Sequence, residues 1–413
     1  MRIESIKARM ILDSRGNPTV EVDVKTKTGF GRAAAPSGAS KGVHEALELR
    51  DGKKEWHGKG VRRAIENVNR IIAPALKGMD ASEQEEIDRK LIELDGTENK
   101  SRLGANAIVA TSMAVLKAAA DSEKKQTYEY LGGKLLPIPM LNVINGGEHA
   151  GNDLAIQEFM LFPVNVNSFS EAMQAASEIY QQLKNDLVKK YGKSARNVGD
   201  EGGFAPGMKE VREAFEILVK AIEETGYSKK VFLAIDSAAT SFYENGKYRI
   251  DGKTISQGEL LEMYKQLVKT YPIKSIEDPF HEEDFEGFAE IKKAIGRSVQ
   301  IVGDDLVVTN PKRIKTAIEK DCMNALLLKV NQIGTVSEAI EAAEVVRKKR
   351  MNVVVSHRSG ETEDAFISHL VVGKEYGMIK TGAPARGERT AKYNELLRIE
   401  ERVGNNYARF NLG

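Results

Sequence analysis

Three acidic residues follow three separate apolar, strand-like runs in the second half of this chain. Asp236 follows VFLAI, Glu277 lies in SIEDP, and Asp304 follows VQIVG. A helix-like stretch comes after each run, and repeated strand–helix units predict a parallel barrel with its active site at the carboxyl ends of the strands. Carboxylates that converge there repel one another unless a divalent cation holds them together. Because the set offers oxygen ligands and no His or Cys, we expect Mg²⁺ rather than Zn²⁺.

The same acids have a plainer interpretation as helix caps. Asp in the loop after a strand commonly caps the helix that follows. One such acid on its own would favour the cap. Three in successive units, two of them inside IEDP and GDD, favour a metal site.

Two further apolar runs end in basic residues. Lys329 lies in ALLLKVNQ, and His357, Arg358 and Ser359 end NVVVSHRS. We expect Lys329 to face the barrel interior, where burial and nearby positive charge lower its pKa so that it can act as a general base. A Lys that only pairs with the metal carboxylates is the alternative. Arg358 and Ser359 suit a phosphate, and Lys380 at the end of GMIK suits a carboxylate, so the set predicts an anionic substrate.

Two more carboxylates, Glu158 in LAIQEFM and Glu201 in VGDEGGF, lie in or beside segments that enter the barrel. Two acids that face each other raise the pKa of one of them, which provides a protonated acid near neutral pH. The glycine-bearing loops around Ser40 (PSGASKG) and His149 (NGGEHAGN) are suited to close over a site that must exclude water. Each is otherwise an ordinary surface loop.

The elements that must position these residues fall into two parts. Residues 1 to about 30 alternate apolar and polar side chains, which predicts antiparallel strands, and the Gly- and Ser-rich stretch 33–46 predicts a loop. Helical periodicity dominates 60–120, so we expect residues 1–130 to form an α+β domain. Five strand–helix units recur within 135–413 and favour a closed barrel. An open doubly wound sheet is disfavoured, because no G-x-G-x-x-G follows an early strand.

Composition excludes several classes of protein. The chain has 413 residues with 61 Lys and Arg against 60 Asp and Glu, so no bulk charge attracts nucleic acid or an anionic membrane. The single cysteine, Cys322, excludes an intrachain disulfide, fits a reducing compartment and is expected to be buried beside ALLLKV. The N-terminus has no secretory pattern, and the apolar runs fall short of the roughly 20 residues that span a bilayer. We therefore expect a cytoplasmic protein without membrane insertion.

Motifs along nearly the whole chain resemble those of the enolase family, in that family's order. They include DSRGNPTVEV, NVINGGEHAGN, LAIQEFM, VGDEGGFAP, SIEDPF, LLLKVNQIGT, VSHRSGETED and IKTGAPARGER. The pair LLLKVNQIGT and SHRSGETED is the most specific. The resemblance implies an α/β fold with an N-terminal α+β capping domain and a C-terminal TIM-like (β/α)8 barrel of the enolase type. It also implies the reversible Mg²⁺-dependent dehydration of 2-phospho-D-glycerate to phosphoenolpyruvate in glycolysis and gluconeogenesis.

The resemblance also implies two Mg²⁺ ions in each active site. Asp236, Glu277 and Asp304 would bind the first ion. Ser40 would help to hold the second, which would arrive with the substrate. Together the ions would stabilise the negative charge that develops on the substrate carboxylate.

Proton transfer is assigned by the same resemblance. Lys329 would accept the C2 proton, since a Lys or His base with Mg²⁺ is the general pattern of the enolase superfamily. Glu201 would protonate the departing C3 hydroxide, with Glu158 and His149 as further catalytic groups. Arg358 and Ser359 would grip the phosphate, and Lys380 the carboxylate. The substrate-binding residues would be Gln157, His149, Glu158, His357, Arg358, Ser359 and Lys380.

Two other functions remain open. An acid-sugar dehydratase or racemase of the wider superfamily also holds Mg²⁺ with three strand-end carboxylates, but it lacks the phosphate grip and the Ser40 loop. A barrel whose main role is binding, such as a plasminogen receptor or an RNA-processing partner, is disfavoured by the neutral net charge and the complete catalytic set. The oligomeric state cannot be read from the residues; the resemblance implies a homodimer or an octamer of dimers.

Overall fold

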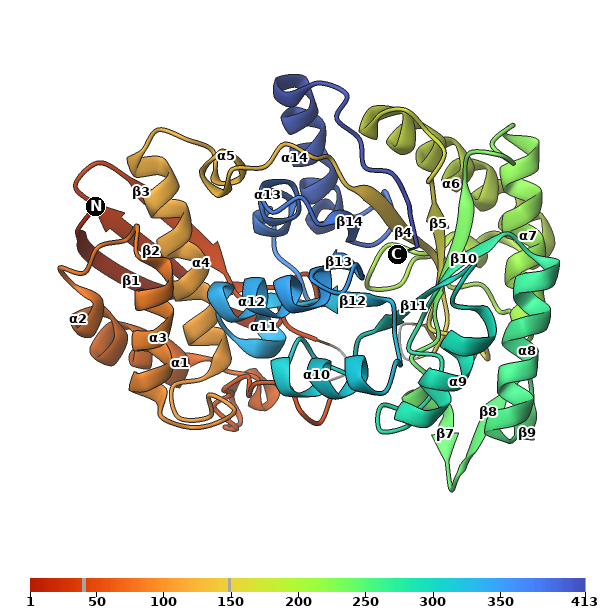
Figure 1. The fold of residues 1–413 in the computed structure, drawn as a ribbon, viewed down its shortest axis with the longest axis horizontal. Helices are drawn as coiled ribbons and strands as arrows, with labels where there is room; N and C mark the ends of the chain where they lie inside the picture. Colours follow the sequence, from red (N-terminus) through yellow and green to blue (C-terminus); the bar gives the residue numbers. More distant parts are fainter. Residues whose placement is uncertain (39–41, 148–149, 413) are drawn as a thin grey trace.

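The computed structural model describes residues 1–38, 42–147 and 150–412, and it has two parts that lie side by side (Figure 1). The N-terminal part, red to orange in Figure 1, contains a three-stranded antiparallel sheet and a group of helices. The C-terminal part contains a closed eight-stranded barrel surrounded by helices. Ser40 and His149 lie outside the described residues.

The N-terminal sheet buries one face against a long helix. Its strands are β1 (Ile3–Leu12), β2 (Pro18–Thr26) and β3 (Phe30–Ala34), which confirms the predicted antiparallel strands. Alternate valines of β2 are fully buried, as period-two patterning requires. Helix α4 (Ala105–Ser122) packs so closely on β3 that a Cβ on Gly31 would lie 2.0 Å from the carbonyl oxygen of Ala114. The remaining elements here are α1 (Arg62–Asn67), the π-helix η2 (Val68–Ile72), α2 (Ala73–Leu76), α3 (Gln84–Asp95), α5 (Thr127–Leu131) and the short η1 (Glu55–Gly58).

The barrel follows the chain order with one reversal. Its strands are β4 (Ile138–Asn145), β5 (Glu158–Phe162), β6 (Phe232–Asp236), β10 (Ile273–Glu277), β11 (Gln300–Gly303), β12 (Ala325–Leu328), β13 (Asn352–Ser356) and β14 (Gly377–Lys380). The helices are α6 (Phe169–Tyr191), α7 (Val211–Glu224), α8 (Gln257–Thr270), α9 (Phe285–Ile295), α10 (Pro311–Glu319), α11 (Val330–Ile333), α12 (Val336–Arg347), α13 (Phe366–Gly373) and α14 (Gly387–Val403). A small sheet of β7 (Tyr243–Glu244), β8 (Lys247–Ile250) and β9 (Lys253–Ile255) and the turns η4 (Lys193–Arg196) and η5 (Ala239–Phe242) complete the fold.

The five predicted strand–helix units form parallel neighbours in the barrel, which confirms the fold class. Strand β5 differs, because it pairs antiparallel with both β4 and β6. In a parallel strand the last residue reaches the mouth of the barrel, whereas in β5 the first residue does. Glu158 therefore lies opposite Asp236, which in turn lies opposite Glu277 on the next strand. The reversal is what brings Glu158 to the strand-end acids.

A buried carboxylate joins the two parts of the molecule. Asp88 on α3 is 1% exposed and accepts hydrogen bonds from the hydroxyls of Ser112 on α4 and Ser337 on α12, both at 2.6 Å. It also accepts from the backbone N–H of Ser337 (2.9 Å) and from Gln84 (3.1 Å). Burial raises the pKa of Asp88 although these hydrogen bonds oppose the shift.

Asp88→Asn is expected to lower the free energy of unfolding by about 1–3 kcal/mol, because an amide nitrogen cannot accept from the Ser337 donors. The loss should depend on pH. The pKa of Asp88 in the folded state lies above its usual value of 3.8. The contribution of Asp88 to the free energy of unfolding is therefore largest at low pH and is lost as pH rises through the folded-state pKa. Denaturant titrations of both proteins between about pH 4 and 8 measure this difference. Two curves that stay parallel would contradict the pKa assignment.

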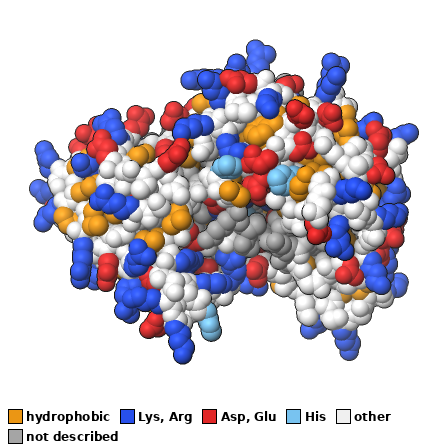
Figure 2. All heavy atoms as spheres, turned by 90° about the horizontal axis from the view of Figure 1, so that it is seen from below, with side chains coloured by type: hydrophobic (Ala, Val, Ile, Leu, Met, Phe, Trp, Pro, Cys, Tyr) orange, Lys and Arg blue, Asp and Glu red, His pale blue; other side chains and the backbone are white. Residues whose placement is uncertain are grey.

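The surface carries charges of both signs. Figure 2 shows Lys, Arg, Asp and Glu side chains interspersed over one face of the molecule. None of the helices in the described parts of the chain has the length and apolar character needed to cross a bilayer. Cys322 is buried, as predicted.

Candidate active site

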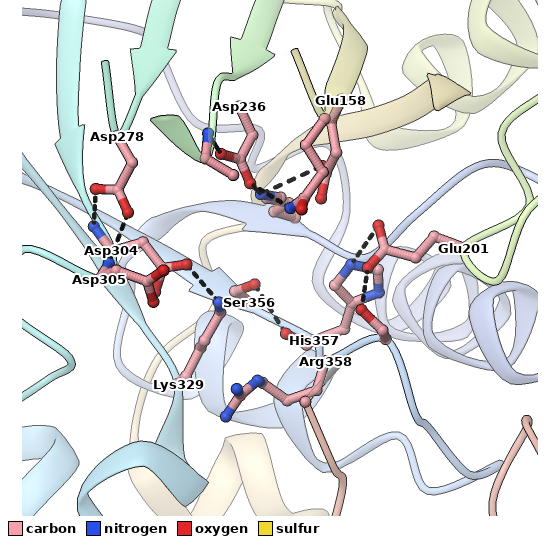
Figure 3. Close-up of a pocket in the computed structure, with 15 residues that line it drawn as sticks. Glu158, Glu201, Asp236, Asp278, Asp304, Asp305, Lys329, Ser356, His357 and Arg358 are labelled. Atoms are coloured by element: carbon pink, nitrogen blue, oxygen red, sulfur yellow. Dashed lines mark hydrogen bonds and ion pairs between the residues drawn. The ribbon is translucent and has the colours of Figure 1, made fainter. Parts of the chain in front are cut away.

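A cavity opens at the carboxyl ends of the parallel strands (Figure 3). Its walls are almost entirely polar. The lining residues are Gly38, Gln157, Glu158, Glu201, Asp236, Ala238, Asp278, Asp304, Asp305, Lys329, Ser356, His357, Arg358, Ser359 and Lys380. Ten predicted site residues are among them, and Glu277 lies beneath the wall with no exposed surface.

The strand-end acids are not helix caps. The helices that follow them begin at other side chains: Ser256 caps α8, Asp284 caps α9 and Asn310 caps α10. The simpler interpretation of the three acids therefore does not hold.

Lys380 lies at the centre of a buried group of carboxylates. Its Nζ is 3.0 Å from Asp236, 2.8 Å from Glu277 and 3.2 Å from Glu158. Burial alone would lower the pKa of Lys380, but the surrounding carboxylates raise it well above its usual value. Burial and the Asp236 charge raise the pKa of Glu277. The ammonium thus supplies the positive charge that this concentration of acids requires.

The donor set fits a hard cation. Oε2 of Glu277 is buried and has no hydrogen-bond partner among the described residues, and the same is true of Oε1 of Gln157. A buried carboxylate oxygen without a partner is costly unless something else satisfies it. Oxygen ligands alone favour Mg²⁺ over softer metals.

The third strand-end acid is held by the predicted base. Nζ of Lys329 lies 2.5 Å from Oδ2 of Asp304, and Gln332 donates to Oδ1 at 3.0 Å. Lys329 directly follows β12 rather than lying within it. The prediction that the pKa of Lys329 is lowered is wrong for this structure. Burial is the largest single effect and would lower the pKa of Lys329, but the neighbouring carboxylates together, Asp304 first and Asp305 with it, leave the pKa raised.

A second acidic group stands beside the first. Within the described ranges, Asp278, Asp304 and Asp305 bring one carboxylate oxygen each within 4.8 Å of one another. Asp236, Glu277 and Asp304 do not form such a group: Lys380 contacts Asp236 and Glu277, and Lys329 contacts Asp304. Both oxygens of Asp278 accept from backbone N–H groups, of Asp304 at 2.9 Å and of Asp305 at 2.7 Å. Asp278 therefore fixes the loop that carries Asp304.

Glu201 enters the cavity away from Lys329 (Figure 3). It accepts hydrogen bonds from Ser359 at 3.0 Å and from Asn142 at 3.1 Å, and Nε2 of His357 lies 3.5 Å away. Burial and the charge of Glu201 raise the pKa of Glu158 well above its usual value. The predicted pairing of two acids is thus present, with Glu158 as the group whose shift is evident.

Arg358 is occupied by a carboxylate from the N-terminal part. Its two Nη atoms donate to Glu45 at 2.9 and 3.0 Å, the fork geometry that a phosphate would also use. Arg358 is 4% exposed and also donates to Asn331 at 3.2 Å.

Several site residues escaped prediction. Asp278 and Asp305 are neighbours of predicted acids inside IEDP and GDD, so the pattern was visible but did not say which acid of each pair faces the cavity. Glu45 lies in the predicted loop and has no apolar pattern around it. Arg389 contacts three residues of the His357 loop from a helix, and no local signal marks it.

Comparisons with known proteins agree with this geometry. The family model described as "Enolase, N-terminal domain" matches residues 3–131, and "Enolase, C-terminal TIM barrel domain" matches residues 133–411. The enolase of Pyrococcus furiosus is 62% identical over 97% of this chain and 95% of its own length. The enolase of Thermococcus gammatolerans is 61% identical with the same coverage, and that of Methanocaldococcus jannaschii 60% over 97% and 96%.

Proposed function

The chain belongs to the enolase family, and from this premise we propose how its cavity residues share the phosphopyruvate hydratase reaction. It is a glycolytic hydro-lyase that interconverts 2-phospho-D-glycerate and phosphoenolpyruvate. Lys329 and Glu201 enter one cavity from different sides (Figure 3). This observation supports giving one of them the role of base and the other the role of acid. The two family models match residues 3–131 and 133–411, which supports a division of the chain into two domains, 1–130 and 135–413.

Asp236, Glu277 and Asp304 are the proposed ligands of the first Mg²⁺. Bound Mg²⁺ would act as a Lewis acid that stabilises the negative charge developing on the substrate carboxylate. Asp278 is assigned the support of the loop that carries Asp304, because both of its oxygens accept from backbone N–H groups of that loop. Ser40 is the proposed ligand of the second ion, which arrives with substrate.

Lys329 is the proposed base for the C2 proton. It must be neutral to accept a proton, whereas in the structure the neighbouring carboxylates of Asp304 and Asp305 favour its protonated form. With Mg²⁺ bound, Asp304 would stabilise the Lys329 ammonium less, because its negative charge would be shared with the metal, and this would lower the pKa of Lys329. The raised pKa therefore belongs to the resting state.

Glu201 is the proposed acid. As the C3–O bond breaks, Glu201 gives its proton to the leaving hydroxide, which departs as water. Hydrogen bonds from Ser359 and Asn142 stabilise the carboxylate that remains. Glu158, Gln157 and His149 complete this side of the site as proposed catalytic or substrate-binding groups.

The phosphate end is assigned to His357, Arg358 and Ser359, and the substrate carboxylate to Lys380. Arg358 already binds an anion through both Nη atoms, which supports its role. A homodimer or an octamer of dimers is also proposed, and light scattering would decide between them. Cytoplasmic location is a further proposal, which cell fractionation tests.

Activity is expected to depend on Mg²⁺. Formation of phosphoenolpyruvate from 2-phospho-D-glycerate, followed by its ultraviolet absorbance, should stop in EDTA and return when Mg²⁺ is in excess. Glu277→Gln should need far more Mg²⁺ to reach half-maximal rate, because the carboxylate with the unsatisfied oxygen is lost. The conservative change Glu286→Gln, on α9, should leave the Mg²⁺ requirement unchanged. Full activity in EDTA, or turnover of acid sugars instead, would overturn the proposal.

A further inference from the structure

Arg389, near the start of α14, has no exposed surface. Burying a guanidinium is costly unless hydrogen-bond acceptors surround it. Its Nη1 lies 2.7 Å from Nδ1 of His357 and donates to the carbonyl oxygen of Arg358 at 2.6 Å. Its Nη2 donates to the carbonyl oxygens of Ser359 and of Asp200, the latter at 3.1 Å. One side chain thus joins the loop after β13 to the loop that carries the proposed acid.

The contact with His357 determines where the imidazole proton resides. A guanidinium can only donate, so Nδ1 of His357 must accept, and a neutral ring then carries its proton on Nε2. His357 is 2% exposed. Burial lowers its pKa to about 4; the charge of Glu201 opposes this shift and that of Arg389 adds to it. The ring is therefore neutral near pH 7.

The protonated nitrogen faces Glu201. Nε2 of His357 lies 3.5 Å from Oε2 of Glu201 and has no hydrogen-bond partner among the described residues. Catalytic hydrogen bonds are often long before substrate binds and shorten in the complex. A small movement would add His357 to the two donors, Ser359 and Asn142, that already contact this carboxylate.

We propose that Arg389 is a positioning residue that fixes the Nε2–H tautomer of His357 and so directs a hydrogen-bond donor at Glu201. The inference rests on the proposed role of Glu201 as proton donor. A donor at Oε2 stabilises the carboxylate that forms when Glu201 releases its proton. In the other tautomer, the Nε2 lone pair would face that negative charge and oppose the step.

Other charged groups also act on Glu201. The titratable or charged side chains that interact with it are Glu158 on β5, His357 after β13, Lys380 on β14 and Tyr393 on α14. Of these four side chains, His357 is the one that Arg389 hydrogen-bonds in the parts of the chain that the structure describes. Loss of Arg389 should therefore act on Glu201 chiefly through the imidazole.

The tautomer can be measured directly in the unsubstituted protein. Two-bond ¹H–¹⁵N correlation spectra of protein labelled at histidine nitrogen distinguish the two tautomers and the charged ring. His357→Gln identifies the signal among the six histidines. We expect a neutral ring with the proton on Nε2 near pH 7. A proton on Nδ1, or a charged ring, would overturn the proposal, and this result does not depend on the role of Glu201.

Arg389→Met tests the consequence, and Lys392→Met is its matched control. Lys392 is also buried on α14 and holds the same loop, through Glu361 at 3.0 Å and the carbonyl oxygen of Thr362, but it does not contact His357. Both variants should lose stability. Only Arg389→Met should produce a mixture of the two His357 tautomers. It alone should lower kcat roughly tenfold to hundredfold. It alone should also move the basic limb of the pH profile of kcat to higher pH.

Arg389→Lys keeps a charged donor and should recover part of kcat and most of the Nε2–H population. The proposal fails if Arg389→Met leaves the tautomer and the pH profile as in the unsubstituted protein. If Arg389→Met does not fold, the tautomer of the unsubstituted protein decides alone, and a proton on Nδ1 of His357 overturns the proposal. It fails equally if Lys392→Met shifts them to the same extent, because the effect would then be structural.

Discussion

Lys329→Met should reduce phosphoenolpyruvate formation by on the order of 10²–10⁴-fold, because the side chain keeps its length and loses its basic nitrogen. The same variant should fail to exchange the C2 hydrogen of 2-phospho-D-glycerate with deuterium from D₂O. Mass spectrometry of recovered substrate measures this exchange. The two losses belong together, since removal of the C2 proton precedes every later step.

Stability gives a second signature of Lys329→Met. The substitution leaves the Asp304 carboxylate, 6% exposed, without its ion-pair partner, so the metal-free variant should unfold more easily. Mg²⁺ should restore much of that stability by binding the Asp304 carboxylate that has lost its ion-pair partner. Lys100→Met is a matched control: Lys100 is buried and pairs with Glu338 at 3.0 Å, away from the cavity. Exchange that persists in Lys329→Met would assign the base elsewhere.

Glu201→Gln should also lose roughly 10²–10⁴-fold of its dehydration rate, but for a different step. Gln keeps the size of the side chain and has no acidic proton for the leaving hydroxide. Because Lys329 is intact, the C2 hydrogen should still exchange with D₂O. Exchange without product therefore separates the acid from the base in one assay.

Glu400→Gln controls for the loss of a buried carboxylate. Glu400 is 8% exposed and accepts from the backbone N–H groups of Phe169 and Ser170, and none of these three residues lines the cavity. It should affect stability and leave kcat close to that of the unsubstituted protein. If Glu201→Gln loses exchange and dehydration to the same extent, Glu201 acts before or during C2 deprotonation and is not solely the acid.

Much of the architecture could be predicted because most barrel strands can be recognised from the apolar run in their own sequence. Apolar runs such as VFLAI and ALLLK end at the barrel mouth, so the residues after them were placed correctly at the cavity. The reversal of β5 was not visible, because strand direction depends on which neighbours a strand finds in space. The prediction at Glu158 nevertheless places that residue at the mouth, since the reversed strand presents its first residue there.

Charge states were harder to predict than positions. The sign of the Lys329 pKa shift depends on burial and on which charges the fold brings close, such as Asp304 at 2.5 Å, and no spacing in the sequence encodes these. Arg389 was missed for a related reason. Its contacts join a helix to loops distant in the sequence, and a single Arg at the start of a helix looks the same whether it is buried or exposed. Long-range polar contacts of this kind follow from the assembled fold.

Arg358 holds a carboxylate before any substrate is present. Glu45 comes from a segment 313 residues away in the sequence and binds the guanidinium through both oxygens. Under the proposed role of Arg358, binding of a phosphate there would be an exchange of anions, and its affinity would be the difference between two similar ion pairs. A substrate analogue without a phosphate would gain nothing by displacing Glu45. Glu45 would thus act as a tethered competitive ligand, and discrimination against unphosphorylated acids would begin before any proton moves.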